Sequence, residues 1–450
     1  MKVLFLDQSG ELGGAELCLL DILRPGQDQN QDQNQDQNPG SRSPETERFR
    51  GKVALFSPGP FKTRLAQAQI DHQLLSEHPR YLRDRPFCFS RRLGELASLS
   101  QSLGDLIQLA RDSDLIYANT PKALVLGAIA HLMTHRPLVY HLHDILSPQH
   151  FGWLNRSLLV GLANQCVTRV IANSQATQQA FVAAGGESAK TSVIYNGFLP
   201  ERFHINPAQT QALRLELGYG GGDRFLIGCC SRFAPWKGQH LLLEALASLK
   251  NPNLHLFFAG EALFGEENYV LQLRQQVQQL GLTAQVQFLG FRQDIPELLS
   301  ICDLLVHSPV APEPFGRVIV EAMLAAKPII APAEGSGPEL LRHDQTGWLI
   351  APRDVQSLAL AIQQLQADPS LRQRLGQAAA AAAQQRFHLQ ETNRAIYALL
   401  KQILQPETEM TPQASPGVAP HASTSSGTSS GTSSATSSAT SSANRPANGS

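Results

Sequence analysis

The stretch Pro312-Glu313-Pro314-Phe315-Gly316-Arg317-Val318-Ile319-Val320-Glu321 is a loop that turns into a helix, and it follows a short apolar run at 303–307. Glu313 lies between two prolines, which favour extended backbone over helix at this position. From Gly316 the spacing of apolar residues becomes helical, which places Glu321 on the second turn, about 7.5 Å along the axis from Gly316. The stretch therefore predicts a strand, a loop and a helix in succession.

Two carboxylates flank the predicted helix start, one in the loop and one a turn deeper. The backbone N–H groups of Phe315, Gly316 and Arg317 crown this helix start, which favours an anion and suits phosphate best. A ligand with hydroxyl groups at both ends and a phosphate in the middle matches this layout. A nucleotide-sugar is such a ligand.

The same strand–helix pattern repeats along the chain. Near-continuous apolar runs indicate strands buried on both faces, as in parallel sheets covered by helices. About six runs fall in each half, so we expect an α/β protein with two doubly wound parallel sheets. The apolar runs are 2–6, 52–56, 114–118, 137–142, 169–172, 191–195, 224–230, 254–259, 284–290, 303–307, 328–331 and 347–351.

We place the domain boundary after Asn196-Gly197, giving domains 1–198 and 199–385 and a final helix at 386–405 that packs back on the first domain. Residues 370–404 are rich in Ala and Gln and predict a long helix there. The polar segment 27–45, with its Gln-Asp-Gln-Asn repeats, is expected to be an exposed insertion, and the Ser/Thr-rich tail 406–450 to be disordered.

The net charge, the cysteines and the lengths of the apolar runs exclude several classes of protein. A net charge of -1 over 450 residues gives no electrostatic case for nucleic acid. The six cysteines have no CxxC spacing and are expected to be buried reduced thiols. The N-terminal apolar run is too short for a signal peptide and no run of about 20 apolar residues exists, so a cytoplasmic protein is expected. A cluster of arginines within 80–92 allows peripheral membrane contact, although a solvated loop is the ordinary interpretation.

Four further motifs lie at predicted strand ends. Ser9 to Glu16 contains Gly13-Gly14, which could bring backbone close to a ligand or simply form a tight turn. In His141-Leu142-His143-Asp144 the two histidines share one face of a strand. A metal site would need a third ligand and none stands out, which leaves hydrogen bonding to a sugar or a structural role.

Arg232 and Lys237 flank a Pro-containing turn at the start of the second half. Two cations at a strand end could neutralise a diphosphate, most strongly as a leaving group gains charge. The alternative is a solvated charged loop. Gly335-Ser336-Gly337-Pro338-Glu339 likewise supplies flexible backbone after the run at 328–331.

Taken in order, these residues resemble family 4 of the retaining glycosyltransferases, which have the GT-B fold. The resemblance covers roughly residues 1–400 and is most specific in the second half. The matching stretches are Gly13 to Glu16, His143-Asp144, Asn173-Ser174, Val193 to Gly197, Arg232 with Lys237-Gly238, Glu313 to Glu321, Gly335 to Glu339 and Thr346 to Trp348. Ser231 and Ser336 depart from the family pattern at positions where glycine is common, and either could narrow the approach of backbone to the donor.

The resemblance implies two Rossmann-like domains facing a cleft, with the donor mainly on the second. It implies catalytic roles for Glu313 at the sugar hydroxyls, for the pair Arg232 and Lys237 at the diphosphate, and for His143 beside the sugar, with His141 in reserve. Glu321 would bind the ribose hydroxyls. The remaining expected donor-binding residues are Phe315, Gly316, Arg317, Gly13, Gly14, Asn196 and Gly260.

The activity implied is transfer of a sugar from a nucleotide-diphosphate donor to a hydroxyl acceptor, with retention at the anomeric carbon and without a metal or another cofactor. Polysaccharide or glycoconjugate biosynthesis is the expected setting. Three alternatives remain open: a catalytically silent nucleotide-sugar-binding partner subunit, a sugar-nucleotide epimerase on the same fold, and a phosphorylase-like enzyme carrying pyridoxal phosphate.

Overall fold

The computed structural model describes residues 1–8, 10–24, 50–75, 92–221, 224–263 and 265–405, and of residues 92–100 only the backbone. The described residues belong to one compact unit. The expected insertion at 27–45, the tail at 406–450 and the arginines at 80–91 lie outside the described residues.

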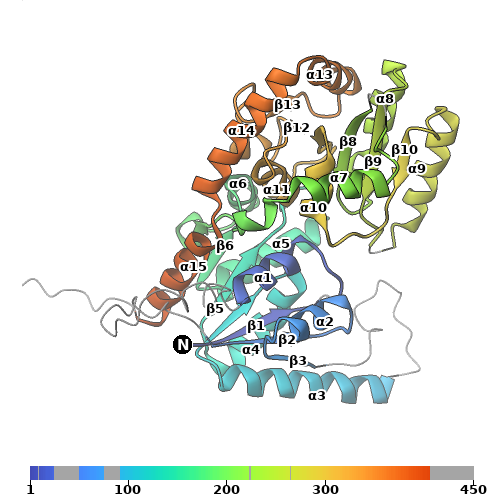
Figure 1. Ribbon diagram of the computed structural model, residues 1–450. Helices are drawn as coiled ribbons and strands as arrows, with labels where there is room; N and C mark the ends of the chain where they lie inside the picture. Colours follow the sequence, from blue (N-terminus) through green and yellow to red (C-terminus); the bar gives the residue numbers. More distant parts are fainter. Residues whose placement is uncertain (9, 25–49, 76–91, 222–223, 264, 406–450) are drawn as a thin grey trace, which may run out of the picture. The chain divides into compact units, whose positions relative to one another are not determined.

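The first half is a seven-stranded parallel sheet in the order β3-β2-β1-β4-β5-β6-β7 (Figure 1). Its strands are β1 (Lys2–Asp7), β2 (Arg50–Leu55), β3 (His72–Leu74), β4 (Leu115–Ala118), β5 (Leu138–Leu142), β6 (Arg169–Ala172) and β7 (Thr191–Val193). Its helices are α1 (Gly14–Leu23), α2 (Pro60–Gln67), α3 (Arg92–Arg111), α4 (Pro121–Thr134), α5 (Trp153–Cys166) and α6 (Gln175–Ala183), with a 3-10 turn η5 (Ser188–Lys190).

The second half is a six-stranded parallel sheet in the order β10-β9-β8-β11-β12-β13. Its strands are β8 (Phe225–Cys230), β9 (Leu254–Ala259), β10 (Val286–Phe288), β11 (Leu304–Val306), β12 (Ile329–Pro332) and β13 (Trp348–Ile350). Its helical segments are η6 (Pro200–Phe203), α7 (Pro207–Glu216), η7 (Pro235–Lys237), α8 (Gln239–Leu249), α9 (Glu267–Gln279), α10 (Ile295–Ile301), α11 (Arg317–Leu324), α12 (Gly337–Leu340), α13 (Val355–Ala367), α14 (Pro369–Arg386) and α15 (Leu389–Leu404).

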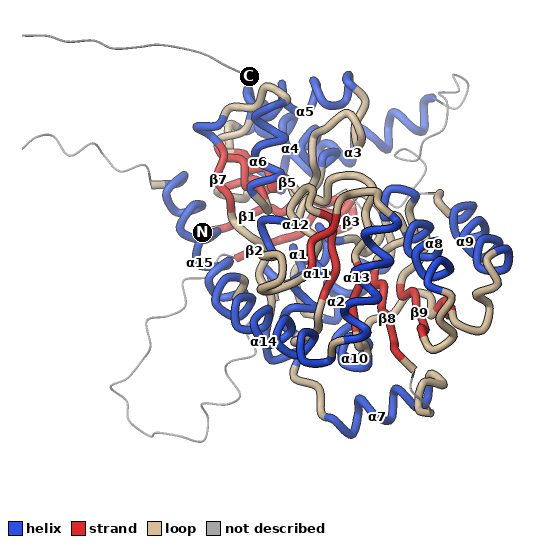
Figure 2. The backbone as a smooth tube through the Cα atoms, turned by 90° about the horizontal axis from the view of Figure 1, so that it is seen from above, coloured by secondary structure: helices blue, strands red, loops and turns tan. Residues whose placement is uncertain are grey.

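Both sheets are buried on both faces, which confirms the α/β prediction. Each has one apolar cluster on either face, and Figure 2 shows the strands enclosed by helices. Adjacent Cys229 and Cys230 of β8 belong to clusters on opposite faces, as the alternation of side chains along a strand requires. Cys18, Cys229, Cys230 and Cys302 are free and buried, whereas free Cys166 is partly exposed.

The prediction of one long helix at 370–404 is wrong, because the chain forms two helices there. α14 ends at Arg386, and His388 is extended and pairs with Phe198 before α15 begins at Leu389. Phe198 N–H donates to the carbonyl of Phe387 at 2.8 Å, and Leu389 N–H donates to the carbonyl of Phe198 at 2.8 Å. The tertiary pairing of these two segments therefore overrides local helix propensity.

Helix α15 packs against the first sheet. Its Ile396 and Leu400 are fully buried in the apolar cluster that contains Val3, Phe5 and Cys18. Among the described residues, no helix is long and apolar enough to cross a membrane.

Candidate functional site

Each sheet has one point where the strand order reverses. β1 lies between β2 and β4, and β8 lies between β9 and β11. In open parallel sheets, ligands bind in the crevice that forms outside the carboxyl ends of the strands at this reversal. Asp7 ends β1, Asn119 follows β4, and His307 follows β11. The polar residues described below cluster around these strand ends.

Glu313 receives two hydrogen bonds on one carboxylate oxygen. Lys237 Nζ lies 2.6 Å from Glu313 Oε2, and His307 Nε2 lies 3.1 Å from the same oxygen. Glu313 and His307 are 7% and 4% exposed. Burial alone raises the pKa of Glu313, but the charge of Lys237 and the hydrogen bond from His307 outweigh it and hold the pKa well below its usual value. This carboxylate is therefore ionised and fixed at neutral pH.

The Gly335–Ser336 turn packs closely against the loop that carries Glu313 and forms hydrogen bonds to it. Gly335 has a φ of +62°, and a Cβ there would lie 2.5 Å from Glu313 N, so only glycine fits. Ser336 N–H donates to the Glu313 carbonyl at 3.0 Å, and Ser336 Oγ donates to the Phe315 carbonyl at 2.7 Å. The serine at this departure from the family pattern therefore uses its hydroxyl to hold the loop.

Trp236 lies between the two predicted diphosphate-binding cations. Lys237 Nζ is 4.1 Å and Arg232 Cζ is 5.6 Å from the centre of its ring, both within cation–π range. The edge of His150, from the first half, meets the same indole at 5.4 Å. Arg232 and Lys237 therefore both lie beside the Trp236 ring, and their role at a diphosphate stays a prediction. Ser231, the other departure, accepts a hydrogen bond from Gln239 Nε2 at 3.0 Å.

Glu321 lies beside Arg317. Arg317 Nε is 3.7 Å from Glu321 Oε1, and Arg317 Nη2 donates to Asp21 Oδ2 of α1 at 2.8 Å. Burial raises the pKa of Glu321, and the charge of Arg317 opposes this rise. The sequence predicted a role for the backbone of Arg317 only, but its side chain links the predicted ribose carboxylate to the first half.

The carbonyl of Pro314, just before α11, is held by two hydroxyl groups at the start of α6. Pro314 O accepts hydrogen bonds from Ser174 Oγ at 2.5 Å and Thr177 Oγ1 at 3.3 Å, both at the start of α6. Within the described part of the chain, the N–H groups of Phe315, Gly316 and Arg317 have no hydrogen-bond acceptor. These donors remain available to an anion.

The side chain of Phe315 is 2% exposed and packs near Phe198 and Phe387. Only its backbone can therefore serve a ligand.

The Gly13–Gly14 turn begins α1 and lies against Arg317. A Cβ on Gly14 would lie 3.8 Å from Arg317 Cδ. Gly13 N–H donates to Glu16 Oε2 at 2.9 Å. Burial, with the nearby charge of Asp7, raises the pKa of Glu16 to about 8. This carboxyl group therefore keeps its proton at neutral pH.

His143 is held in one tautomer by Asn119. Asn119 Nδ2 donates to Asp7 Oδ2 at 2.8 Å and to the Ala15 carbonyl at 3.1 Å. Because that carbonyl can only accept, Asn119 Oδ1 must face His143 Nε2, which lies 3.0 Å away and therefore carries the proton. Burial and the neighbouring His141 lower the pKa of His143 well below its usual value. The neutral ring is left with Nδ1 as a hydrogen-bond acceptor.

The two remaining predicted residues serve packing in this structure. Asn196 is 3% exposed, and its Oδ1 accepts from Cys18 Sγ at 3.1 Å. A Cβ on Gly260 would lie 2.0 Å from the Ser231 carbonyl, so backbone crosses backbone there. Gly260 supports the Arg232 loop through this close contact.

Sequence reasoning missed His307, Trp236, Asn119 and Asp21. The sequence contained a signal for three of these residues. His307 and Asn119 lie at the ends of apolar runs, and Trp236 lies between the two cations Arg232 and Lys237. Asp21 had none, because its partner Arg317 is 296 positions away.

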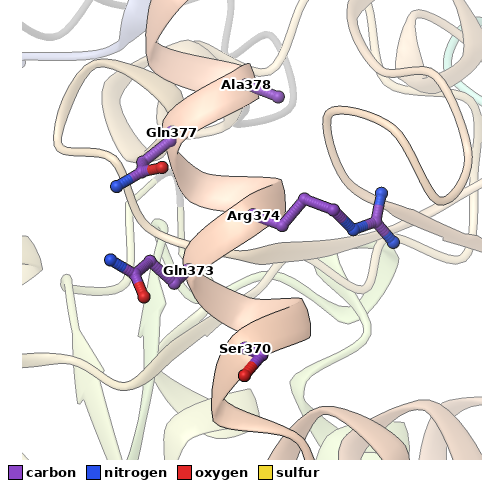
Figure 3. Close-up of a pocket in the computed structure, with 5 residues that line it drawn as sticks. All are labelled: Ser370, Gln373, Arg374, Gln377 and Ala378. Atoms are coloured by element: carbon purple, nitrogen blue, oxygen red, sulfur yellow. The ribbon is translucent and has the colours of Figure 1, made fainter.

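A shallow depression on α14 offers no comparable chemistry. Its lining comes from one helix: Ser370, Gln373, Arg374, Gln377 and Ala378 (Figure 3). Its one charged group, Arg374, is already paired with Asp344 at 2.6 Å.

Two family models match this chain. Glycosyltransferase Family 4 matches residues 47–202, and Glycosyl transferases group 1 matches residues 221–382.

Among solved structures, Anabaena HepE in complex with UDP-glucose is 44% identical and has a TM-score of 0.78, covering 89% of this chain and 99% of that one. HepE in complex with UDP and glucose is 45% identical with a TM-score of 0.77 and the same coverage. The Bacillus subtilis putative glycosyltransferase EpsD is 35% identical over 43% of this chain and 49% of its own length. The chain thus spans about half the length of the curated relatives it matches.

Proposed function

We propose that this chain, which belongs to the glycosyl transferases group 1 family, moves a sugar from a nucleoside-diphosphate-sugar to a hydroxyl acceptor with retention at the anomeric carbon. One observation carries the proposal. A buried carboxylate is kept ionised by Lys237 and His307 at the strand end where Arg232 also converges. Fixed opposite charges at one strand end suit a ligand that brings both hydroxyl groups and a diphosphate.

Each group then has one task. Glu313 accepts hydrogen bonds from sugar hydroxyls, and His143 accepts one more at Nδ1. Arg232 and Lys237 neutralise the diphosphate together with the unpaired N–H groups at the start of α11. Glu321 accepts from the ribose hydroxyls. The donor we propose first is UDP-glucose, because HepE, at 44% identity, was solved with that molecule.

Reaction on one face of the sugar accounts for retention. The bond from the anomeric carbon to the β-phosphate oxygen breaks, and the acceptor oxygen bonds to the same face. The departing phosphate oxygen takes the acceptor's proton. No pair of flanking carboxylates of the glycoside hydrolase type is needed. Arg232 and Lys237 carry the charge of the leaving group, so we propose a reaction independent of metal and of other cofactors.

The acceptor we propose is a glycan or lipid in polysaccharide or glycoconjugate assembly. The relatives support this setting by name, since one is a lipopolysaccharide core biosynthesis glycosyltransferase of Rhizobium meliloti. We propose that the protein works in the cytoplasm, with peripheral contact to the membrane that would present such an acceptor.

Calorimetric titration of UDP, GDP and ADP tests the donor site. We expect selective binding of UDP, weakened about tenfold or more by Glu321→Ala through loss of charge-assisted hydrogen bonds. Glu391→Ala is the matched control, because this glutamate is exposed and pairs with Arg394 on α15. Equal binding of the three nucleotides, or none to folded protein, contradicts the donor assignment.

Transfer itself is tested with UDP-glucose and a panel of hydroxyl acceptors in EDTA, with NMR of the product's anomeric proton. Retained configuration and full rate in EDTA are expected. An inverted product, or a rate restored only by Mg²⁺ or Mn²⁺, overturns the mechanism. Donor binding without transfer would identify a silent partner subunit, and conversion of donor alone would identify an epimerase.

A further inference from the structure

Three potential metal ligands meet beside the proposed sugar site. They are Cys18 of α1, His141 at the end of β5 and His143 just after it, and one ligand atom from each lies within 4.8 Å of the other two. The rings of His141 and His143 are 3.9 Å apart, because residues i and i+2 of an extended chain face the same way. The sequence lacked a third ligand for this pair of histidines, and the fold supplies it from 123 positions away.

Both histidines have a polar partner at their other ring nitrogen, and the thiol of Cys18 donates to Asn196. Tyr117 Oη lies 2.8 Å from His141 Nδ1, Asn119 Oδ1 lies 3.0 Å from His143 Nε2, and Cys18 Sγ lies 3.1 Å from Asn196 Oδ1. Metal-binding histidines in proteins characteristically use their other nitrogen in this way, which fixes the ring and its tautomer. Nε2 of His141 and Nδ1 of His143 are then left for an ion, and the sulfur of Cys18 joins them once its thiol gives up the proton that it donates to Asn196.

His141 gives the independent sign of a missing ligand. Its side chain is 1% exposed, and its Nε2 has no hydrogen-bond partner among the described residues. Leaving a buried imidazole nitrogen without a partner destabilises the fold. A group at this position would remove that cost.

We propose that Cys18, His141 and His143 bind Zn²⁺ and that the bound ion inhibits the enzyme. One thiolate and two imidazoles suit a borderline-soft ion, and three protein ligands leave a fourth tetrahedral position open. The ligand atoms of tetrahedral zinc lie roughly 3.5 Å apart, so side-chain movements of about 1 Å complete the set. His143 is partly exposed, which gives the ion a way in.

Inhibition is expected because the zinc ion and the sugar would use the same atom, Nδ1 of His143. His143 Nδ1 is the acceptor that the proposed function gives to a sugar hydroxyl, and it cannot accept a hydrogen bond while it binds zinc. The inhibitory part therefore rests on the proposed function, whereas the binding part does not. Since the ion has no part in the reaction, a chelator is expected to leave the rate unchanged or to restore it.

The first test is binding alone, with the full chain and no donor or acceptor. Zn²⁺ is titrated against a chromophoric chelator, and Co²⁺ is used as a spectroscopic probe, because a thiolate ligand gives a sulfur-to-cobalt charge-transfer band. We expect one ion per chain with a dissociation constant of about 1 µM or tighter, and we expect the cobalt band.

Cys18→Ser is expected to weaken zinc binding at least tenfold and to abolish the cobalt band, whereas Cys166→Ser, a free and partly exposed cysteine on α5, changes neither. His141→Asn gives a second variant that leaves the thiol in place and should weaken binding by a similar factor. Thermal melting establishes that each variant folds. Binding weaker than about 100 µM in wild type, or unchanged in both variants, overturns the proposal.

Inhibition is measured separately, as the zinc dependence of transfer in wild type. A wild-type rate unaffected by saturating zinc refutes the inhibitory role and leaves the metal site standing. Failure of transfer under all conditions refutes the proposed function and leaves the binding result intact.

Discussion

The two halves differ in the charge of the groups at their strand ends: ionised groups in the second half and neutral groups in the first. In the second half, the charged pair Lys237 and Glu313 is buried at 2.6 Å, and His307 lies 3.1 Å from the same carboxylate oxygen, although burial lowers the pKa of this histidine. In the first half, His143 is a neutral ring that Asn119 holds in place. Glu16, whose raised pKa keeps its carboxyl group protonated, lies nearby. A diphosphate and its neighbouring hydroxyls call for fixed charge, whereas a single hydroxyl calls for a fixed acceptor. Burial alone does not set the protonation state of a carboxyl group, because Glu313 and Glu16 are both buried and their pKa values shift in opposite directions.

Removing one charge from the second half gives the largest expected effect. In Lys237→Met, Glu313 loses its cation and remains as a buried carboxylate, which costs about 3–5 kcal/mol in the free energy of unfolding. Transfer is expected to fall about 10²–10³-fold, since the proposed function assigns Lys237 to the charge of the leaving group. Denaturant unfolding and the rate under saturating donor check the two effects.

The double variant Lys237→Met with Glu313→Gln separates them. It should regain most of the lost stability, because no unpaired charge remains, and it should not regain activity. Stability that stays low in the double variant would show that the pair's contribution is not electrostatic.

The pH dependence of stability distinguishes the two carboxyl groups. The folded-state pKa of Glu313 is held below its ordinary 4.5, so its contribution is complete above pH 4.5 and is lost as the pH falls below that value. The folded-state pKa of Glu16 is about 8, so its contribution is complete below pH 4.5 and is lost as the pH rises toward 8.

Unfolding curves between pH 3 and 9 test both signs. Glu313→Gln should remove part of the acid loss of stability, and Glu16→Gln should remove a slope of up to about 1.4 kcal/mol per pH unit between pH 5 and 8. An unchanged alkaline slope in Glu16→Gln would mean that another group keeps the proton.

In the first half, Asn119→Leu releases the tautomer of His143. The ring then loses the acceptor at Nε2 that keeps Nδ1 unprotonated, so kcat should fall about tenfold with little change in UDP affinity. Asn251→Leu is the control, since its side-chain amide donates to Gln366 Oε1 at 3.0 Å and accepts from Asn253 N–H at 3.0 Å, both in the second half. A parallel loss of UDP affinity would place the effect on the fold rather than on the ring.

The smallest effect is expected at an exposed pair outside both clusters. Arg374 and Asp344 lie 2.6 Å apart, each 54% exposed, and exposed pairs contribute about 0–1 kcal/mol. Arg374→Ala should leave both the rate and the melting temperature nearly unchanged. A large change would mean that surface charge, and not burial, governs this protein's stability.

Most of the fold was predictable because strands buried on both faces appear as continuous apolar runs. The strand that the sequence missed is β3, His72–Leu74, which is short, polar and half-buried at the edge of its sheet. An edge strand is exposed along one side, so it needs no such run. The break at Phe387–His388 was missed for the converse reason, since only pairing with Phe198 stops a helix that local propensity would continue.

Local periodicity and spacing were enough to predict two parallel sheets, the loop-to-helix pair Glu313 and Glu321, and the two cations that flank a turn. Which side chains meet depends instead on how the strands are arranged in space. His307 joins Glu313, Arg317 reaches Asp21 across 296 positions, and Cys18 joins two histidines. Parallel strands bring their carboxyl ends to one edge whatever their separation in sequence, so contacts between those ends leave no local pattern.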